Sequence, residues 1–344
     1  MMTEPPKRIL IIKMSSLGDI MTALPILAPL RRAFPQAYIA WAVQREFAPV
    51  LPGAPHIDEM IPIDRAEIRS PRYWRQLRAQ LHEKRFDCVL DLQMIAKSAI
   101  VAALSGASRR YGYWEAREGS GWISRPLVGA HQYGHITDRL LDVLRELDIP
   151  VGEITYPLPN IDGECREVRR ILAERQWRHS FAVVAPGSRG AGKIWPVEKW
   201  QKVVAHLLAH DVAVVLTGSA SERETVNRIC GPFEGRDVLS LAGRTNLRQL
   251  MAWERMACLH ISGDTGPLHI ANALRTPIVG LYGPTLPERS GPYAHPQAWT
   301  ALAAQPADRA AHVKRDDRVD MNTLPVSEVI ALIDCGLSAS TAEK

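Results

Sequence analysis

Residues 263–284, GDTGPLHIANALRTPIVGLYGP, are the most informative stretch of this chain. Strand-forming residues 258–261 lead into this stretch, and the small and polar residues 263–266 predict a tight turn. Residues 269–274 then predict a short helix, and 277–281 the next strand. A strand, a glycine-rich turn and a helix gather backbone N–H groups and a helix N-terminus around one point, which suits the diphosphate of a nucleotide.

The side chains of this turn distinguish a binding site from an ordinary β–α connection. Glycine and aspartate alone are common turn residues and support either interpretation. A binding site is favoured by the further polar groups of the stretch, which are Asp264, Thr265 and His269.

Strands alternate with helical segments along the whole chain, which predicts an α/β fold with doubly wound parallel sheets. In the first half, strands are expected at 8–14, 38–43, 59–63, 87–92 and 109–113. In the second half, they are expected at 181–185, 212–217, 238–240, 257–261 and 277–281. Two Rossmann-like lobes that bind ligands at the carboxyl ends of their strands imply a cleft between them.

Three further segments complete the expected organisation. A helical pattern over 19–34 contains two prolines that are expected to bend it. Residues 150–165 are rich in proline and glycine and predict the linker between the lobes. A terminal helix is expected at 325–337, followed by a frayed tail at 338–344.

The composition limits the class of protein. The chain has 344 residues, of which 46% are hydrophobic, enough for two folded domains. Its net charge of +5 and pI of about 9.0 fit an acidic partner such as a phosphorylated glycolipid. Nucleic acid is disfavoured as a partner, because the sequence has neither zinc-finger spacing nor an RNP-like motif.

Cysteine usage and apolar runs predict where the protein resides. The five cysteines are scattered and never at C-x-x-C spacing, which predicts reduced thiols in the cytoplasm. The N-terminus leads straight into a strand, so no signal peptide is expected. No apolar run approaches the ~20 residues of a membrane span. We therefore expect a protein that is soluble or lies on a membrane surface.

A P-loop is the first alternative for nucleotide binding. The spacing Gly187-x-x-x-x-Gly192-Lys193 matches the opening of that motif and follows a strand. Ile194, however, stands where the motif needs a Ser or Thr hydroxyl for magnesium. Pro196 also predicts that the helix begins near itself rather than at the Gly-Lys pair. The sequence therefore disfavours an NTPase or kinase.

The sequence gives little support for a metal site. It contains no D-x-D motif, and neither of its two histidine pairs at i, i+4 spacing carries the glutamate of H-E-x-x-H. Gly134 weakens a helix through His131 and His135, and His206 with His210 lacks an obvious third ligand. Surface or capping histidines are the preferred interpretation, and we predict no metal centre and no cofactor.

Residues 65–85 form a strongly basic segment with seven Lys or Arg against two Glu. Ser70-Pro71 is a favourable helix start, and Trp74, Leu77 and Leu81 then fall on one helical face. An amphipathic surface helix packed on the sheet is the preferred interpretation. Contact with anionic lipid headgroups is the alternative.

Several stretches together resemble the bacterial ADP-heptose:lipopolysaccharide heptosyltransferases, which form glycosyltransferase family 9. Beside 263–284, they are KMSSLGD at 13–19, FDCVLDLQ at 86–93, AKS at 96–98, YGYWEAREGS at 111–120, PGSRGAGKIWP at 186–196 and GSASERE at 218–224. The resemblance covers nearly the whole chain, from 8 to 335, and its motifs are specific in combination.

The resemblance implies a two-lobed GT-B architecture. Residues 1–160 would form an acceptor-binding lobe and 161–325 a nucleotide-sugar-binding lobe, while 326–344 would be a helix returning toward the first lobe, plus a tail. The implied activity is an inverting, metal-independent transfer of a heptosyl group from ADP-heptose to a Kdo or heptose hydroxyl of the lipopolysaccharide inner core. Such an enzyme would work in the cytoplasm, at or near the inner face of the inner membrane.

The resemblance also implies a set of donor-binding residues in the second lobe. Lys193 would neutralise the departing diphosphate, and Glu222 would bind the ribose, with Glu224 as its near competitor. Thr245 would contact the adenine, mostly through its backbone. The full donor set is Ser188, Lys193, Glu222, Thr245, Asp264, Thr265, Gly266 and His269.

Asp19 has two interpretations. It follows a strand and a Ser-Ser-Leu-Gly turn and opens a helix, so the residues alone favour an N-cap or first-turn aspartate. The resemblance implies instead that Asp19 is the general base, which takes the proton of the acceptor hydroxyl as its oxygen attacks the anomeric carbon.

A basic set in the first lobe matches the acceptor-binding positions of the family: Lys13, Lys97 and Arg117. The three lie on separate β–α loops that would open at one sheet edge, although each alone would be an ordinary surface charge. The chain departs from the family at Met94, where glycine is common, and at Ile136-Thr137. Both departures lie near the expected acceptor side and leave acceptor identity open.

Three alternatives to heptosyl transfer from ADP-heptose to the inner core stay open at this stage. A GT-B transferase of this kind would serve another ADP-sugar or another glycan acceptor with the same nucleotide contacts. A non-catalytic nucleotide-sugar-binding module would share the donor site and lack turnover. A P-loop-like NTPase is the most distant of the three.

Overall fold

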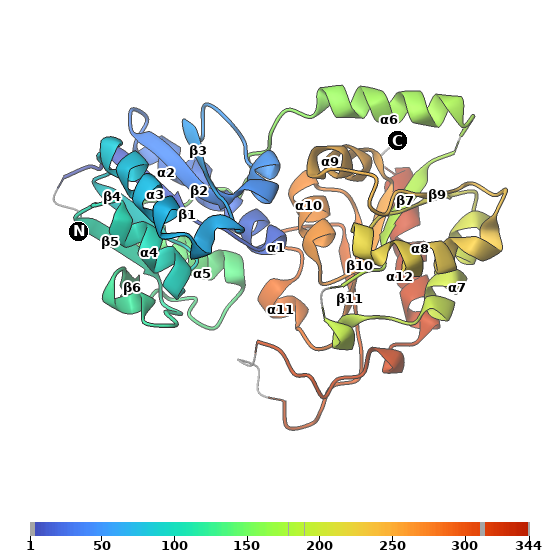
Figure 1. The fold of residues 1–344 in the computed structure, drawn as a ribbon. Coiled ribbons are helices and arrows are strands. Elements are labelled where there is room, and N and C mark those ends of the chain that lie inside the picture. Colours follow the sequence, from blue (N-terminus) through green and yellow to red (C-terminus); the bar gives the residue numbers. More distant parts are fainter. Residues whose placement is uncertain (1–3, 178, 189, 310–313, 343–344) are drawn as a thin grey trace. The chain divides into compact units, whose positions relative to one another are not determined.

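In the computed structural model of this chain, residues 4–177, 179–188, 190–309 and 314–342 are described. The chain divides into two compact units, Met1–Pro159 and Asn160–Lys344, each built on one sheet (Figure 1). The division falls inside the proline- and glycine-rich stretch 150–165 that the sequence predicts as the linker.

The first unit contains a six-stranded sheet in the order β3-β2-β1-β4-β5-β6, with all neighbouring strands parallel. Its strands are β1 (Arg8–Ile12), β2 (Tyr38–Gln44), β3 (Glu59–Ile63), β4 (Cys88–Asp91), β5 (Arg109–Tyr113) and β6 (Arg125–Leu127). Its helices are α1 (Leu17–Met21), α2 (Leu27–Ala33), α3 (Pro71–Glu83), α4 (Ala96–Leu104) and α5 (Ile136–Arg145).

The second unit repeats the plan with the strand order β12-β11-β10-β7-β8-β9, again all parallel. Its strands are β7 (Phe181–Ala185), β8 (Ala213–Leu216), β9 (Val238–Ser240), β10 (Leu259–Gly263), β11 (Ile278–Tyr282) and β12 (Ala298–Leu302). Its helices are α6 (Asp162–Glu174), α7 (Val197–Ala209), α8 (Arg223–Cys230), α9 (Leu247–Met256), α10 (Gly266–Leu274), α11 (Pro287–Ser290) and α12 (Val326–Ala342).

The predicted fold class and strands are confirmed, and two strands were missed. The short β6 contains a proline, and β12 is only partly buried apart from Ala301, so neither has a buried run of β-formers. The predicted helix over 19–34 is broken into α1, a 3₁₀ turn at Leu24–Ile26 and α2, in agreement with the bend expected at its prolines.

The terminal helix α12 is longer than the sequence predicts, and the expectation of a frayed tail is wrong for residues 338–342. The helix packs against β10, β11, β12 and α7 of its own unit, and Val329 and Ile333 are fully buried there. Leu337, which directly precedes the additional residues, packs against the same core. A return of the helix toward the first lobe stays a prediction.

The basic segment 65–85 forms α3, whose N-cap is Ser70 as predicted. Leu77 and Leu81 are buried, and Tyr73 and Trp74 pack against the same core of the first unit. The two aromatic side chains are therefore partly buried against this core, which favours the amphipathic surface helix. Among the described residues, no helix is both long enough and apolar enough to cross a bilayer.

A buried polar chain runs through the second unit directly beneath the turn at 263–266. The Nδ1 atom of His260 lies 2.9 Å from Glu254 Oε2, and its Nε2 atom lies 2.7 Å from Ser262 Oγ. All three side chains are completely buried. Because the Ser262 hydroxyl cannot meet a substrate there, the arrangement is a structural support for β10 and the turn that follows it.

We expect His260→Leu to lower the free energy of unfolding by about 3–5 kcal/mol, because it leaves the buried Glu254 carboxyl without its partner. Ser262→Ala, which removes the hydrogen bonds of this hydroxyl with His260 and with the Gly263 carbonyl oxygen, should cost about 1–3 kcal/mol. Chemical denaturation of both variants measures their free energies of unfolding and checks that His260→Leu is the more destabilising change. A double variant, Glu254→Met with His260→Leu, should recover part of the loss, and equal stability of wild type and His260→Leu would contradict the assignment.

Candidate nucleotide-sugar site

All predicted donor residues except Thr245, which follows β9, gather at the carboxyl ends of three neighbouring strands of the second sheet. Strands β10, β7 and β8 lie side by side in that order. The loop after β7 carries Ser188 and Lys193, the turn after β8 carries Glu222, and the turn after β10 carries Asp264. The topology therefore brings together segments that are separated by up to 76 positions in the sequence, as the parallel-sheet prediction required.

An ion pair joins the first and last of these loops. The Nζ atom of Lys193 lies 2.7 Å from Asp264 Oδ2 and 3.3 Å from the Asp264 carbonyl oxygen. His269, on the first turns of α10, places its Nε2 atom 3.5 Å from Asp264 Oδ1. The three side chains are nearly buried, at 18%, 10% and 8% exposure respectively.

This arrangement keeps the Asp264 carboxyl ionised. Burial alone would raise its pKa, but the hydrogen bond with His269 and the positive charge of Lys193 outweigh burial and lower the pKa well below its usual value. The carboxylate therefore acts only as an acceptor, and it holds the Lys193 ammonium at the mouth of the turn.

Glu222 meets the loop after β7 at Gly187. A Cβ atom on Gly187 would overlap the Glu222 carboxylate, so this close approach requires glycine. Ser219 fixes the carboxylate by donating from its backbone N–H at 2.6 Å and from its hydroxyl at 2.7 Å, both to Oε2. Glu224 is exposed on the first turn of α8, so Glu222 is the acid that the structure places against the glycine-rich loop.

The other predicted donor residues occupy neighbouring positions. Ser188 is half-buried in the loop after β7, and Thr245 directly precedes Asn246, the N-cap of α9. Thr265 is the N-cap of α10 and Gly266 its first residue, so the helix N-terminus opens at this turn. The Thr265 hydroxyl is buried and has no hydrogen-bond partner among the described residues.

The loop after β7 lacks P-loop geometry. Residues Ala191–Lys193 form a 3₁₀ turn, and α7 begins only at Val197 after Pro196. The Gly-Lys pair therefore does not open the helix, as the proline predicted. Trp195 is buried, packs edge-on against Trp200 with ring centroids 5.1 Å apart, and anchors the start of α7.

Arg315 is a basic residue of the site that the sequence analysis missed. Its guanidinium group lies over the glycine-rich loop, since a Cβ on Gly190 would come within 2.9 Å of Nη1 and one on Gly192 within 3.7 Å of Nη2. Arg315 therefore adds a second cation to this loop, and its Nε atom is paired with the exposed Asp317. Its segment follows β12 and has no periodic pattern, so no local sequence signal marked it.

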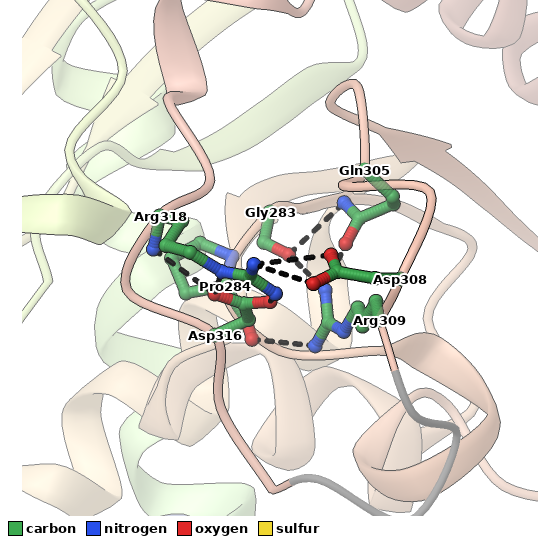
Figure 2. Close-up of polar contacts among 7 residues, drawn as sticks. All are labelled: Gly283, Pro284, Gln305, Asp308, Arg309, Asp316 and Arg318. Carbon is green, nitrogen blue, oxygen red and sulfur yellow. Dashed lines mark hydrogen bonds and ion pairs between the residues drawn. The ribbon is translucent and has the colours of Figure 1, made fainter.

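A network of arginines attaches this segment to the end of β11 (Figure 2). Arg309 donates to the carbonyl oxygens of Gly283, at 3.0 Å, and Pro284, at 2.6 Å. Arg318 pairs with Asp308 at 3.0 Å and with Asp316 at 2.7 Å, and its hydrogen bonds lower the pKa of Asp316 to about 2. The network fixes the chain on both sides of Arg315.

In the first unit, Asp19 lies on the first turn of α1 and completes a capping box with Ser16. The Ser16 N–H and hydroxyl donate to Asp19 Oδ2 at 2.9 Å and 2.7 Å. The structure thus confirms the first-turn interpretation. A carboxylate has about four acceptor sites, so this capping role is compatible with a second role as a base.

The three basic residues of the first unit differ in their surroundings. Lys97 and Arg117 are exposed, and their loops touch, because the Arg117 N–H donates to the Met94 carbonyl oxygen at 3.0 Å. Lys13 is only 4% exposed and donates from Nζ to the Leu92 carbonyl oxygen at 2.7 Å. The interpretation of Lys13 as an ordinary surface charge is therefore wrong.

Met94 has a φ angle of 49°, a backbone conformation that favours glycine. In the resembling family glycine is common at this position, and methionine must adopt here the same left-handed backbone conformation. The Met94 side chain fills the space above Gly112, where a Cβ would overlap its sulfur atom.

The first histidine pair has structural roles. His135 is the N-cap of α5 and accepts from the Thr137 N–H at 3.1 Å, while His131 Nδ1 lies 2.7 Å from Asp142 Oδ1. The capping interpretation is confirmed for His135.

Comparison with known sequences identifies the family. The model of the family described as "Glycosyltransferase family 9 (heptosyltransferase)" matches residues 74–319, more than half of the chain. Lipopolysaccharide heptosyltransferase 1 of Pseudomonas aeruginosa is 29% identical over 301 residues, which are 84% of this chain and 82% of that protein.

Solved structures share the fold. A glycosyltransferase of family 9 from Veillonella parvula superposes with a TM-score of 0.83 at 20% identity, covering 97% of both chains. The E. coli heptosyltransferase WaaC with ADP superposes with a TM-score of 0.75 at 23% identity, covering 96% of this chain and 99% of that one. These neighbours confirm the predicted GT-B architecture. From its sequence, its two parallel sheets and the residues gathered at their strand ends, the chain therefore belongs to glycosyltransferase family 9, the heptosyltransferases.

Proposed function

We propose that this heptosyltransferase moves the heptosyl group of ADP-heptose to a sugar hydroxyl of the lipopolysaccharide inner core, with inversion and without a metal ion. The Lys193–Asp264 contact carries the proposal, because it places a cation at the end of a glycine-rich loop and beside a helix N-terminus. The names of the similar proteins, which include lipopolysaccharide heptosyltransferase 1 and a heptosyltransferase with ADP, support the donor and acceptor classes.

The donor contacts follow from the chemistry of each group. Lys193 has three N–H donors, so it retains Asp264 while it donates to the diphosphate. Asp264 accepts only, so it orients Lys193 and binds sugar hydroxyls rather than phosphate. Arg315 supplies a second positive charge at the same loop. Ser188, Thr265 and the backbone N–H groups near Gly266 complete the diphosphate site, while Glu222 binds the ribose and Thr245 the adenine.

The transfer is a direct displacement. The acceptor hydroxyl oxygen attacks the anomeric carbon, and Asp19 takes its proton as the new C–O bond forms. The bond from the anomeric carbon to the diphosphate breaks on the opposite face, and ADP leaves with the bonding electrons. Lys193 and Arg315 stabilise the negative charge that develops on the leaving oxygen, a task that a metal ion performs in other transferases. A single displacement inverts the configuration.

The test of this proposal is mass spectrometry of the product after the full chain is mixed with ADP-heptose and defined acceptors that end in Kdo or in heptose. The expected mass increase is one heptosyl unit on one acceptor class. ADP-sugars with other sugars serve as competitors, and preferred transfer of one of them would replace ADP-heptose as the donor. Release of phosphate from ATP and magnesium without an acceptor would favour the NTPase.

Lys193→Ala should lower kcat roughly 10²–10³-fold, because it removes a preorganised donor to the developing negative charge. Steady-state kinetics with saturating acceptor measure the change. Lys202→Ala, which removes an exposed lysine of α7, is the matched control and should keep normal turnover. A Lys193→Ala enzyme with wild-type kcat would exclude a role in leaving-group stabilisation.

Asp19→Asn should lower turnover by roughly 10²–10⁴ while the protein folds and binds ADP normally, because an amide keeps the shape and lacks the basicity. Ser16→Ala removes one capping bond and keeps the carboxylate, so it separates capping from catalysis and should have a small effect. If Asp19→Asn retained wild-type turnover with chemistry rate-limiting, Asp264 would become the next base to test.

Arg117→Glu should raise the KM for an anionic acceptor and leave the affinity for ADP nearly unchanged, because we propose that Lys13, Lys97 and Arg117 hold anionic groups of the acceptor. Arg125→Glu makes the same charge change at another exposed position of the first unit and should affect the KM much less. A change in donor KM alone would show that the lobes are assigned the wrong way round.

A further inference from the structure

A cluster of three metal-ligating side chains lies in the second unit, outside the donor site. His206 is on the last turn of α7 and His210 is its C-cap, while Asp334 belongs to α12. One ligand atom from each of the three lies within 4.8 Å of the other two. The sequence shows only the histidine pair, and packing of α12 against α7 supplies the third group from a position 128 residues away.

The histidine rings are oriented for coordination. His210 Nδ1 lies 2.9 Å from the His206 carbonyl oxygen, so this nitrogen carries the proton and donates it. The other ring nitrogen of His210, Nε2, therefore keeps its lone pair for a ligand. Metal-binding histidines commonly donate one ring N–H to a backbone carbonyl in this way. His206 Nε2 already lies 2.7 Å from Asp334 Oδ1, and the two histidine ring centroids are 4.2 Å apart.

The electrostatic surroundings favour a cation. The last carbonyl groups of α7 carry the negative end of the helix dipole, and both histidines lie at this end. Asp334 adds a full negative charge. The contact of His206 with Asp334 and the Nδ1 hydrogen bond of His210 hold the three groups together without an ion, so the ligand set is already assembled for a shared cation.

We propose that His206, His210 and Asp334 bind one divalent transition cation of the Zn²⁺ class and so tie the terminal helix to α7. Two imidazoles and one carboxylate suit such ions, while Mg²⁺ and Ca²⁺ prefer oxygen ligands. The 13 residues of α7 span about 20 Å, and the donor loop precedes their other end. The site is therefore structural and does not depend on the proposed sugar transfer.

The test is calorimetric titration of Zn²⁺ into the full chain without a histidine tag, carrying Cys335→Ser because this exposed thiol follows Asp334 and would also bind zinc. We expect one zinc per chain and a rise in Tm that a chelator reverses, since a ligand of the native state stabilises it. Mg²⁺ should produce neither effect. Absence of stoichiometric zinc binding would overturn the proposal.

Variants assign the site. In the same background, His210→Ala and Asp334→Asn should each weaken zinc binding roughly tenfold or more, since loss of even an outer-shell partner costs that much. His82→Ala, which removes an exposed histidine of α3, is the matched control and should bind zinc normally. Zinc affinity that is unchanged in both His210→Ala and Asp334→Asn would place the ion elsewhere and refute the assignment.

Discussion

The contact between Lys193 and Asp264 is the interaction on which the candidate nucleotide-sugar site depends. It joins the loop after β7 to the turn after β10, and these two strands are hydrogen-bonded neighbours in the sheet. Placing two charges in a nearly buried position is costly unless further hydrogen bonds satisfy them. His269 and the Asp264 carbonyl oxygen supply those bonds, so the pair is held in a single geometry before any ligand arrives.

The sheet beneath the pair provides the rigidity that such a site needs. The buried chain of Glu254, His260 and Ser262 ends directly at the turn that carries Asp264. On the other side, Trp195 anchors the start of α7 by packing on Trp200, which fixes the loop that carries Lys193. Both members of the pair are therefore positioned by groups that never contact substrate.

The candidate site has two cationic side chains, Lys193 and Arg315, which come from different segments. Asp264 already neutralises part of the Lys193 charge, so a diphosphate with more than one negative charge calls for a further cation. Arg315 lies over the same loop, and the arginine network around Arg309 and Arg318 holds its segment to the end of β11 (Figure 2). The irregular segment after β12 thus contributes a charged side chain to the candidate nucleotide-sugar site.

The architecture could be predicted from the amino-acid sequence, and so could the edge of the second sheet at which the candidate donor residues gather. Runs of β-formers alternating with helical periods predict parallel sheets, and polar residues directly after those runs must meet at one sheet edge. Lys193, Glu222 and Asp264 do lie at that edge, while their binding of a donor stays a prediction. Such patterns act locally, over one turn or one strand. Tertiary structure alone decided the contacts between segments without local pattern: the burial of Lys13, the approach of Arg315 to the glycine-rich loop, and the meeting of Asp334 with two histidines. Each of these depends on which surfaces pack together, and packing is a property of the whole folded chain.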